Sequence, residues 1–180
     1  LDTILKQFLH AIRPTRPEIR TVQINQLIEE TLQVLEPTLA DREVTVELDL
    51  DPKLPPHPVD QDQLKQVFFN LVKNGYEALS GTHGQLVLRS RFTDDELLVD
   101  IIDNGSGISP ELMGSIFEPY SSGKKSGTGL GLLIVRRIVR EHGGELEIQS
   151  ELGQGTRVTL YFPRHERRVR LLELENDGRG

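Results

Sequence analysis

Residues 124–132, KKSGTGLGL, place two lysines directly before three glycines at alternate positions, and an apolar helical pattern follows at once. Glycines allow backbone N–H groups to close around an anion, and the first turn of a helix presents N–H donors that lack partners within the helix. The lysines add positive charge. The stretch therefore predicts a phosphate-binding loop at the start of a helix. A plain glycine-rich linker would have the same composition, so the prediction depends on the rest of the chain.

The composition is that of an ordinary globular chain, with 180 residues of which 36% are hydrophobic and 27% charged. The formal net charge of −7 argues against a general nucleic-acid-binding protein, which would carry a basic excess. The absence of cysteine excludes disulfides, thiolate zinc sites and cysteine nucleophiles. No apolar run approaches the roughly 20 residues of a membrane span, and no signal peptide is visible. We expect a cytoplasmic setting, and a piece of a longer chain because the sequence opens within a helical pattern.

Hydrophobic periodicity predicts helices and strands that alternate along the chain. Apolar residues at helical spacing predict a helix over 1–12, which the prolines of RPTRPEI (13–19) then end. Further helices are expected from a cap at Asn25 to about residue 39, from a cap at Asp60 to about 79, after Ser109–Pro110, and over 130–142. Alternating stretches predict strands at 43–50, 85–92, 96–103, 145–150 and 156–162, whereas 52–59 is expected to be a loop.

Short links join most of these strands, which favours antiparallel pairing. The expected fold is α+β: a two-layer sandwich in which a mixed, mostly antiparallel sheet carries helices on one face, rather than a doubly wound parallel sheet. Residues 118–129 have no aliphatic side chain and are expected to form a mobile lid. We expect the end of a helix at 1–13, a linker and first strand at 14–24, the main domain at 25–163 and a charged tail at 164–180.

Two asparagines in NLVKNGYEAL (70–79) are candidates for binding a metal. Asn70 and Asn74 are four residues apart, so they lie on one side of the predicted helix, beside its apolar stripe. Asparagine is a mediocre helix former, and its amide oxygen can ligate Mg²⁺ that phosphates already hold. Two solvated polar residues would explain this pair equally well when it is taken alone.

Two further motifs follow the predicted strand 96–103. In DNGSGIS (103–109), Asp103 could accept a hydrogen bond from an exocyclic amine, and Gly105 and Gly107 could let a flat ring approach the backbone. A simple Asp-Asn-Gly turn is the alternative. In the lid, Phe117 offers an apolar anchor, and Lys124 and Lys125 can reach phosphate oxygens.

A last glycine-rich stretch, GQGTRV (153–158), is expected to form a hairpin turn, with any role in a site additional to that. Each motif is weak alone, but their order and spacing are specific. A helix with two asparagines, an Asp-x-Gly-x-Gly turn, a lid bounded by Phe and Gly-x-Gly-x-Gly, and Gly-x-Gly-Thr follow one another between residues 70 and 156.

This order resembles the Bergerat-type ATPases, and most closely the catalytic ATP-binding domain of two-component sensor histidine kinases of the nitrogen-regulation type. The resemblance covers roughly residues 20–163. It implies the Bergerat ATP-binding fold, ATP and Mg²⁺ as cofactors, and transfer of a phosphoryl group from ATP to a histidine.

The resemblance also implies a role for each matched residue. Asn74 would ligate Mg²⁺, with Asn70 helping to hold the metal and phosphates, and Asp103 would accept from the adenine amine. The other nucleotide-binding residues would be Gly105, Gly107, Phe117, Lys124, Lys125, Gly127, Thr128, Gly129, Leu130, Gly131 and Thr156, the last together with Gly153 and Gly155. The catalytic set would be Asn70, Asn74 and Lys124, which contacts the β- and γ-phosphates.

Two departures from the family pattern concern the triphosphate. Many relatives carry Lys or Arg three residues after the second Asn, where this chain has Glu77. A carboxylate cannot pair with phosphate, so more of that charge would fall on Lys124 or Lys125. The lid, YSSGKK (120–125), is also leaner and more polar than the often aromatic lid of the family.

The histidine that receives the phosphate is not recognisable in this sequence. His10 lacks the acidic neighbour of the family motif His-Glu-x-Arg-Asn-Pro and lies too close to Asn70. FLHAIRP (8–14) instead resembles the end of the second dimerisation helix, which assigns 1–13 to that helix. The remaining histidines have no adjacent acid and are expected on the surface: His57, His83, His142 and His165.

The implied partners are therefore ATP or ADP, a histidine-containing dimerisation domain of the same kinase, and the receiver domain of a response regulator. No nucleic-acid partner is expected. The full kinase is expected to be a homodimer, with or without a membrane anchor. This fragment keeps only a stub of the interface, so its dimerisation is weakened and a monomer is compatible with it.

Three alternatives remain at this point. An ATP-hydrolysing member of the superfamily needs a carboxylate base one turn before the metal-binding asparagine, but that position holds Asn70, an amide without useful basicity. A serine kinase of the same fold is compatible with the two asparagines, although the helical stub and the prolines at 13–17 favour the histidine kinase. A non-catalytic module would normally have lost the acid or the glycines, which are intact.

Overall fold

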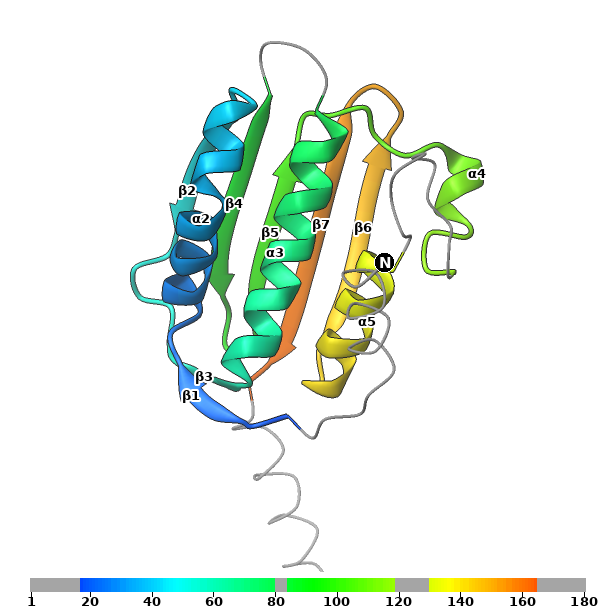
Figure 1. Cartoon of the computed structure of the whole chain (residues 1–180). Coiled ribbons are helices and arrows are strands. Elements are labelled where there is room, and N and C mark those ends of the chain that lie inside the picture. Colours follow the sequence, from blue (N-terminus) through cyan, green and yellow to red (C-terminus); the bar gives the residue numbers. More distant parts are fainter. Residues whose placement is uncertain (1–16, 80–83, 119–129, 165–180) are drawn as a thin grey trace, which may run out of the picture.

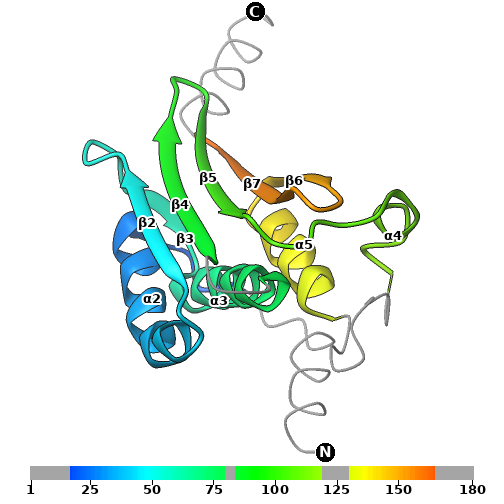
Figure 2. The same ribbon diagram turned by 90° about the horizontal axis from the view of Figure 1, so that it is seen from above.

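The computed structural model describes residues 17–79, 84–118 and 130–164. Its five-stranded sheet has the order β2-β4-β5-β7-β6, formed by β2 (Thr45–Leu50), β4 (Gln85–Phe92), β5 (Glu96–Asp103), β7 (Gly155–Pro163) and β6 (Glu145–Glu151). β2 and β4 are parallel, and the other neighbouring pairs are antiparallel. Three helices cover one face of the sheet (Figures 1 and 2), namely α2 (Ile24–Asp41), α3 (Gln61–Ala78) and α5 (Gly131–Glu141). The predicted α+β sandwich is confirmed.

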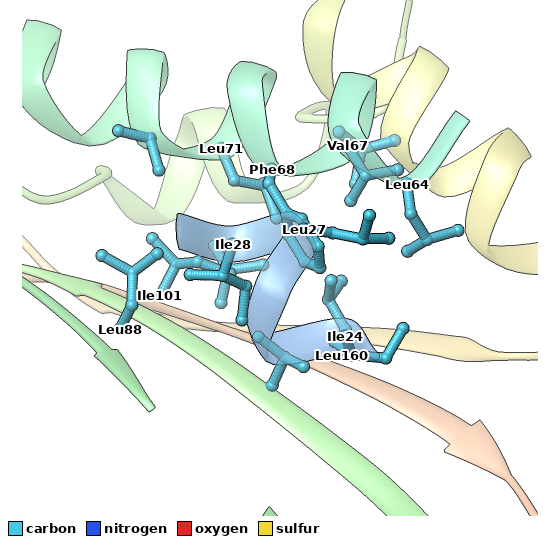
Figure 3. Close-up of a cluster of buried hydrophobic side chains, with 14 of the residues drawn as sticks. Ile24, Leu27, Ile28, Leu64, Val67, Phe68, Leu71, Leu88, Ile101 and Leu160 are labelled. Carbon is cyan, nitrogen blue, oxygen red and sulfur yellow. The ribbon is translucent and has the colours of Figure 1, made fainter. Parts of the chain in front are cut away.

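The hydrophobic core lies between the helices and the sheet, because side chains alternate between the two faces of each strand. In β4, Leu86, Leu88 and Ser90 are buried while the residues between them are only partly covered. Figure 3 shows part of the resulting cluster, contributed by α2, α3 and the strands: Ile24, Leu27, Ile28, Leu64, Val67, Phe68, Leu71, Leu88, Ile101 and Leu160. Full burial of such a side chain contributes about 1.5–3 kcal/mol, so this cluster fixes the helices on the sheet.

The opposite face of the sheet, which none of the described helices covers, is held by charged and polar contacts. Asp100 is buried there, and it accepts from Arg157 Nε and Nη2 at 3.0 and 2.9 Å and from Thr159 Oγ1 at 2.7 Å. The hydrogen bonds to Asp100 raise the pKa of the Arg157 guanidinium, against the opposing effect of burial. On β2, the hydrogen bond from Arg91, and then that from Arg89, lowers the pKa of the Asp49 carboxyl. A face built in this way can contact water without a covering layer.

Most predicted boundaries lie within one or two residues of the observed ones, but one predicted cap is wrong. The Asp60 side chain accepts from the backbone N–H groups of Asp62 and Gln63, and Ser109 accepts from Leu112 N–H before the short helix α4 (Pro110–Met113). By contrast, Asn25 does not cap α2, which begins one residue earlier at Ile24. Its amide instead donates to the Asp51 carbonyl at 2.8 Å and accepts from Ser90 Oγ at 2.8 Å, tying α2 to the sheet.

The predicted loop 52–59 is wrong at its end, where His57–Val59 forms strand β3. β3 pairs antiparallel with β1 (Arg20–Val22), which lies within the predicted linker and first strand. A three-residue strand that contains proline has no readable alternation, so only the distant partner defines it. The boundaries of the four expected parts of the chain stay predictions.

The surface position predicted for two histidines is also wrong. His57 is buried, with its ring centroid 6.0 Å from that of Phe162. His142 is buried at the end of α5, where its Nδ1 lies 2.7 Å from the Ile138 carbonyl oxygen and its Nε2 accepts from Asp60 N–H at 3.0 Å. His142 therefore joins the end of α5 to the start of α3.

Several predictions concern residues outside the described ranges. They are the helix over 1–12 with His10, the positions of His83 and His165, the lid from residue 119 to 129, and the tail beyond residue 164. Within the described ranges, no helix is both long and apolar enough to cross a membrane.

We predict that Leu160→Ala lowers the free energy of unfolding by about 2–5 kcal/mol, because it removes a side chain that is 0% exposed and leaves a cavity. The control is Leu152→Ala, the same chemical change at a side chain that is 64% exposed, where a change within about 0.5 kcal/mol is expected. Urea unfolding followed by circular dichroism measures both. Equal losses for the two variants would contradict the assignment of the core.

Candidate functional site

The two asparagines of α3 face the beginning of α5. A Cβ built on Gly131, the first residue of α5, would lie 3.8 Å from Asn74 Oδ1 and 3.9 Å from Asn70 Oδ1. Leu130, directly before it, is buried, and its carbonyl accepts from Ile134 N–H at 3.0 Å. The amide oxygens of both asparagines are therefore placed next to the helix N-terminus that the glycine-rich stretch predicts.

The amide nitrogen of Asn70 is buried without a hydrogen-bond partner among the described residues, and the only other such side-chain atom there is Gln63 Oε1. An unmade hydrogen bond of this kind costs about 1–3 kcal/mol, which is a reason to look for a ligand. The two amide oxygens beside Gly131 suit a hard cation such as Mg²⁺. The N–H groups of the Asn70 amide, which have no partner among the described residues, suit the oxygens of a phosphate. The described residues contain no group of three or more His, Cys, Asp or Glu that could hold a metal by themselves. The site thus fits a metal held jointly with a phosphate ligand.

The helix that carries the asparagine pair, α3, packs against the end of β5, where Asp103 lies. A Cβ built on Gly75 would lie 2.6 Å from Leu86 Cδ2 and 3.7 Å from Asp103 Cβ. The Asp103 carboxylate accepts from Gly105 N–H at 2.8 Å, which orients it at the start of the loop after β5. Asp103 thus lies beside Gly75, the residue that follows Asn74 in α3, although 29 residues separate Asn74 from Asp103 in the sequence.

The glycines of the loop after β5 are required by contacts within the chain itself. A Cβ on Gly105 would lie 2.6 Å from the Ala78 carbonyl oxygen at the end of α3. At Gly107, with φ of +66°, a Cβ would lie 2.0 Å from the Glu151 carbonyl oxygen of β6. Whether these glycines also admit a flat ring, as the sequence suggested, stays a prediction. The described contacts already explain why no side chain fits at either position.

Thr156 lies beside Asp103, and sequence reasoning missed the residue that holds it. Asp103 of β5 is directly opposite Thr156 of β7, which is directly opposite Ser150 of β6. Ser150 Oγ lies 2.9 Å from Thr156 Oγ1, accepts from Ile108 N–H at 2.9 Å and donates to the Gly155 carbonyl at 2.8 Å. Ser150 could have been identified from the sequence by pairing the two strands of the hairpin about the turn at Gly153, which puts Ser150 opposite Thr156.

Phe117 also has a partner that the sequence did not reveal. Arg136 of α5 places its Cζ 4.5 Å from the centre of the Phe117 ring, which is a cation–π contact. This contact attaches the segment before the predicted lid to α5. The pairing requires the two segments to be brought together in space, so no local pattern could have predicted it.

Glu77, the departure noted in the sequence, is paired within its own helix. Its carboxylate lies 3.8 Å from Lys73 Nζ, one turn earlier. The neighbouring Tyr76 is buried and stacks with Arg42, whose Cζ lies 5.0 Å from the ring centre. Burial, followed by the nearby Glu77 carboxylate, raises the pKa of the Tyr76 phenol, so this side chain stays neutral.

The remaining predicted phosphate contacts lie outside the described residues, so their positions stay predictions: Lys124, Lys125, Gly127, Thr128 and Gly129. A hollow at the ends of β5, β6 and β7 is lined by Asp103, Ser150 and Thr156 together with residues between them, among which are Ile102, Gln149 and Arg157. Ile102, Gln149 and Arg157 alternate with Asp103, Ser150 and Thr156, so their side chains lie on the other face of the sheet while the hollow reaches the residues of the candidate site.

Comparison with known proteins places this geometry in context. Residues 59–166 match the family described as "Histidine kinase-, DNA gyrase B-, and HSP90-like ATPase". Sensor histidine kinase ZraS of Escherichia coli K12 is 32% identical over 163 residues, covering 91% of this chain and 35% of ZraS. Sensory histidine kinase/phosphatase NtrB of Vibrio alginolyticus is 35% identical over 162 residues, covering 83% of this chain and 46% of NtrB. The chain therefore spans less than half the length of either relative.

Solved structures show the same fold. The catalytic domain of histidine kinase ThkA is similar with a TM-score of 0.73 and 29% identity, covering 81% of this chain and 95% of that domain. ThkA in complex with the response regulator TrrA is similar with a TM-score of 0.76 and 27% identity, covering 90% of this chain and 46% of that chain.

We predict that Gly107→Ala destabilises the chain more than Gly153→Ala, by about 1 kcal/mol or more. Both glycines have a positive φ, of +66° and +82°, so both substitutions carry the backbone cost of about 1–2 kcal/mol. Only at Gly107 does the new Cβ meet backbone, since nothing lies within 4 Å at Gly153. Urea unfolding of the two variants measures the difference, and a Gly107→Ala variant as stable as the Gly153→Ala one would refute the close packing of this loop.

Proposed function

This chain belongs to the family of histidine kinase-, DNA gyrase B-, and HSP90-like ATPases, and on that premise we propose that it is the ATP-binding catalytic domain of a sensor histidine kinase. It binds Mg-ATP and donates the γ-phosphate to a histidine of a dimerisation domain of the same kinase. The observation that carries the proposal is the placement of Asn70 and Asn74 against Gly131, which puts two amide groups beside a helix N-terminus.

In this proposal, one set of residues contacts the phosphates of the nucleotide and another contacts its base. At the phosphate end, the amide oxygens of Asn74 and Asn70 would hold Mg²⁺, which would supply neutralising charge to the phosphate oxygens. The Asn70 N–H₂, which has no partner among the described residues, would donate to a phosphate oxygen. At the base end, the Asp103 carboxylate accepts from the exocyclic amine of adenine, with Thr156 beside it.

The segment between these ends closes the site in this proposal. Phe117, anchored on Arg136, marks where the lid begins, and Gly131 marks where it joins α5. Lys124 and Lys125 neutralise charge on the β- and γ-phosphates, and the backbone N–H groups of the glycine box approach them. Because position 77 holds a carboxylate, which pairs with Lys73 and cannot pair with phosphate, the lid lysines carry the positive charge that many relatives place at this position of α3. Catalysis then consists of positioning and charge neutralisation.

Asn70 argues for phosphoryl transfer over hydrolysis. A water-activating base must be a carboxylate one helical turn before the metal-binding residue, and this chain has an amide there. The similarity to ZraS and NtrB favours histidine over serine as the acceptor. ThkA forms a complex with a response regulator, and we propose a receiver domain as the second partner of this kinase too.

The assembly and location belong to the same proposal. The longer kinase is a homodimer through its dimerisation domain, and this domain works in the cytoplasm, where its nucleotide is supplied. A membrane anchor elsewhere in the kinase is compatible with that location.

We predict that the chain binds ATP at least about tenfold more tightly with Mg²⁺ than with EDTA, by isothermal titration calorimetry. Asn74→Ala should remove this gain and leave the affinity in EDTA unchanged, because the metal loses its ligand while the adenine contacts remain. Asp103→Asn should weaken binding in both conditions, since an amide N–H₂ facing the adenine amine offers a second donor. Loss of binding in EDTA by Asn74→Ala would show that this residue does not act through the metal.

Transfer is tested by incubating the chain and Mg-ATP with a histidine-containing dimerisation domain of a sensor histidine kinase supplied as a separate chain. The expected product is acid-labile and alkali-stable, as phosphohistidine is. An acid-stable product would indicate a serine kinase, and release of phosphate without labelled protein would indicate a hydrolase. Either outcome would overturn the assignment of the reaction.

A further inference from the structure

Three side chains form a row across the sheet at the base end of the site. Asp103, Thr156 and Ser150 are directly opposite one another on β5, β7 and β6. Directly opposed residues of antiparallel strands lie on the same face. That face is the helix-covered one, because Asp103 follows the core residue Ile101 by two positions and Thr156 precedes the core residue Leu160 by four.

The direction of the hydrogen bonds in this row follows from the chemistry of the groups. The Gly155 carbonyl can only accept, so the single proton of the Ser150 hydroxyl is used in that contact, at 2.8 Å. The Ile108 N–H can only donate, so it occupies one lone pair of Ser150 Oγ, at 2.9 Å. The remaining contact, 2.9 Å to Thr156 Oγ1, must then have Thr156 as the donor. These three hydrogen bonds use the one proton and both lone pairs of the Ser150 hydroxyl.

This direction decides what Thr156 can offer a ligand. With its own proton turned toward Ser150, the Thr156 hydroxyl can only accept any further hydrogen bond. The ionised Asp103 carboxylate, its neighbour on β5, can also only accept. The base end therefore presents two adjacent acceptors, which match a group that carries N–H donors and repel a carbonyl oxygen.

We propose that Ser150 is a specificity-determining residue, which selects a purine with an amine at ring position 6 over one with a carbonyl there, by fixing the Thr156 hydroxyl as an acceptor. This inference rests on the proposed function, because it assumes that a purine nucleotide occupies this end of the site. The inference adds Ser150 to the residues of the proposed nucleotide site, as a residue that does not contact the base and acts through Thr156.

The test compares ATP with ITP, which differ at position 6 and in the protonation of N1, by calorimetric titration of the chain in Mg²⁺. Ser150→Ala frees the Thr156 hydroxyl to donate to a carbonyl, so the ratio of ATP to ITP affinity should fall roughly 3- to 10-fold, the effect of one hydrogen bond. Ser150→Thr keeps the hydroxyl and should retain the parent ratio. Gln149→Ala, a neighbour on the other face of β6, is the control and should not change it.

A second variant keeps the test decisive if Ser150→Ala is poorly folded by thermal unfolding. Thr156→Val removes the accepting hydroxyl and should lower the same ratio, since the inference has Ser150 act only through this group; an unchanged ratio would overturn the inference. Parallel losses of ATP and ITP affinity at an unchanged ratio would mean that Ser150 only supports the loop at Ile108, which overturns the inference. A parent chain that binds neither nucleotide would overturn the proposed function itself.

Discussion

The site depends on one close contact between backbones, at the loop that follows β5. Ser106 N–H donates to the Ala78 carbonyl at 3.0 Å, and the Ser106 carbonyl accepts from Gly153 N–H at 2.7 Å. The loop is thus held between the end of α3 and the β6–β7 hairpin, and neither Gly105 nor Gly107 leaves room for a side chain. Because α3 carries the asparagine pair and β5 ends in Asp103, this contact sets the distance between the two ends of the site.

The fold could be predicted from the sequence wherever a local pattern determines structure. The strands 85–92 and 96–103 were predicted to the residue, since alternation and the short link between them are both local signals. The cap at Asp60 was predicted for the same reason. Asn25 was misjudged because its amide bonds to Asp51 and Ser90, which the chain brings together only after folding. Short strand β3 and the burial of His142 depend on distant partners in the same way.

The site was predictable to a similar depth. Asn70, Asn74 and Asp103 could be proposed as site residues because their motifs occur in a specific order, and the structure places the asparagines against the start of α5 and Asp103 beside Gly75 of the same helix α3. Ser150 and Arg136 could not, because a serine in a strand and an arginine in a helix are common and gain meaning only from cross-strand register or a stacking contact. The family pattern thus predicts which groups contact the nucleotide, and the folded chain shows which neighbours hold the described ones in place.

The order of the strands has a consequence for crowded solutions. β6 stands at one end of the sheet, so one row of its backbone groups has no neighbouring strand in the described part of the chain. Such a border can recruit a strand from another molecule and seed aggregation. Glu145, Glu147 and Glu151 are exposed along this strand and would meet like charges in an identical partner. Like charges along this edge strand disfavour its pairing with a second copy of β6, so the glutamates protect an open edge that the fold itself leaves uncovered in the described residues.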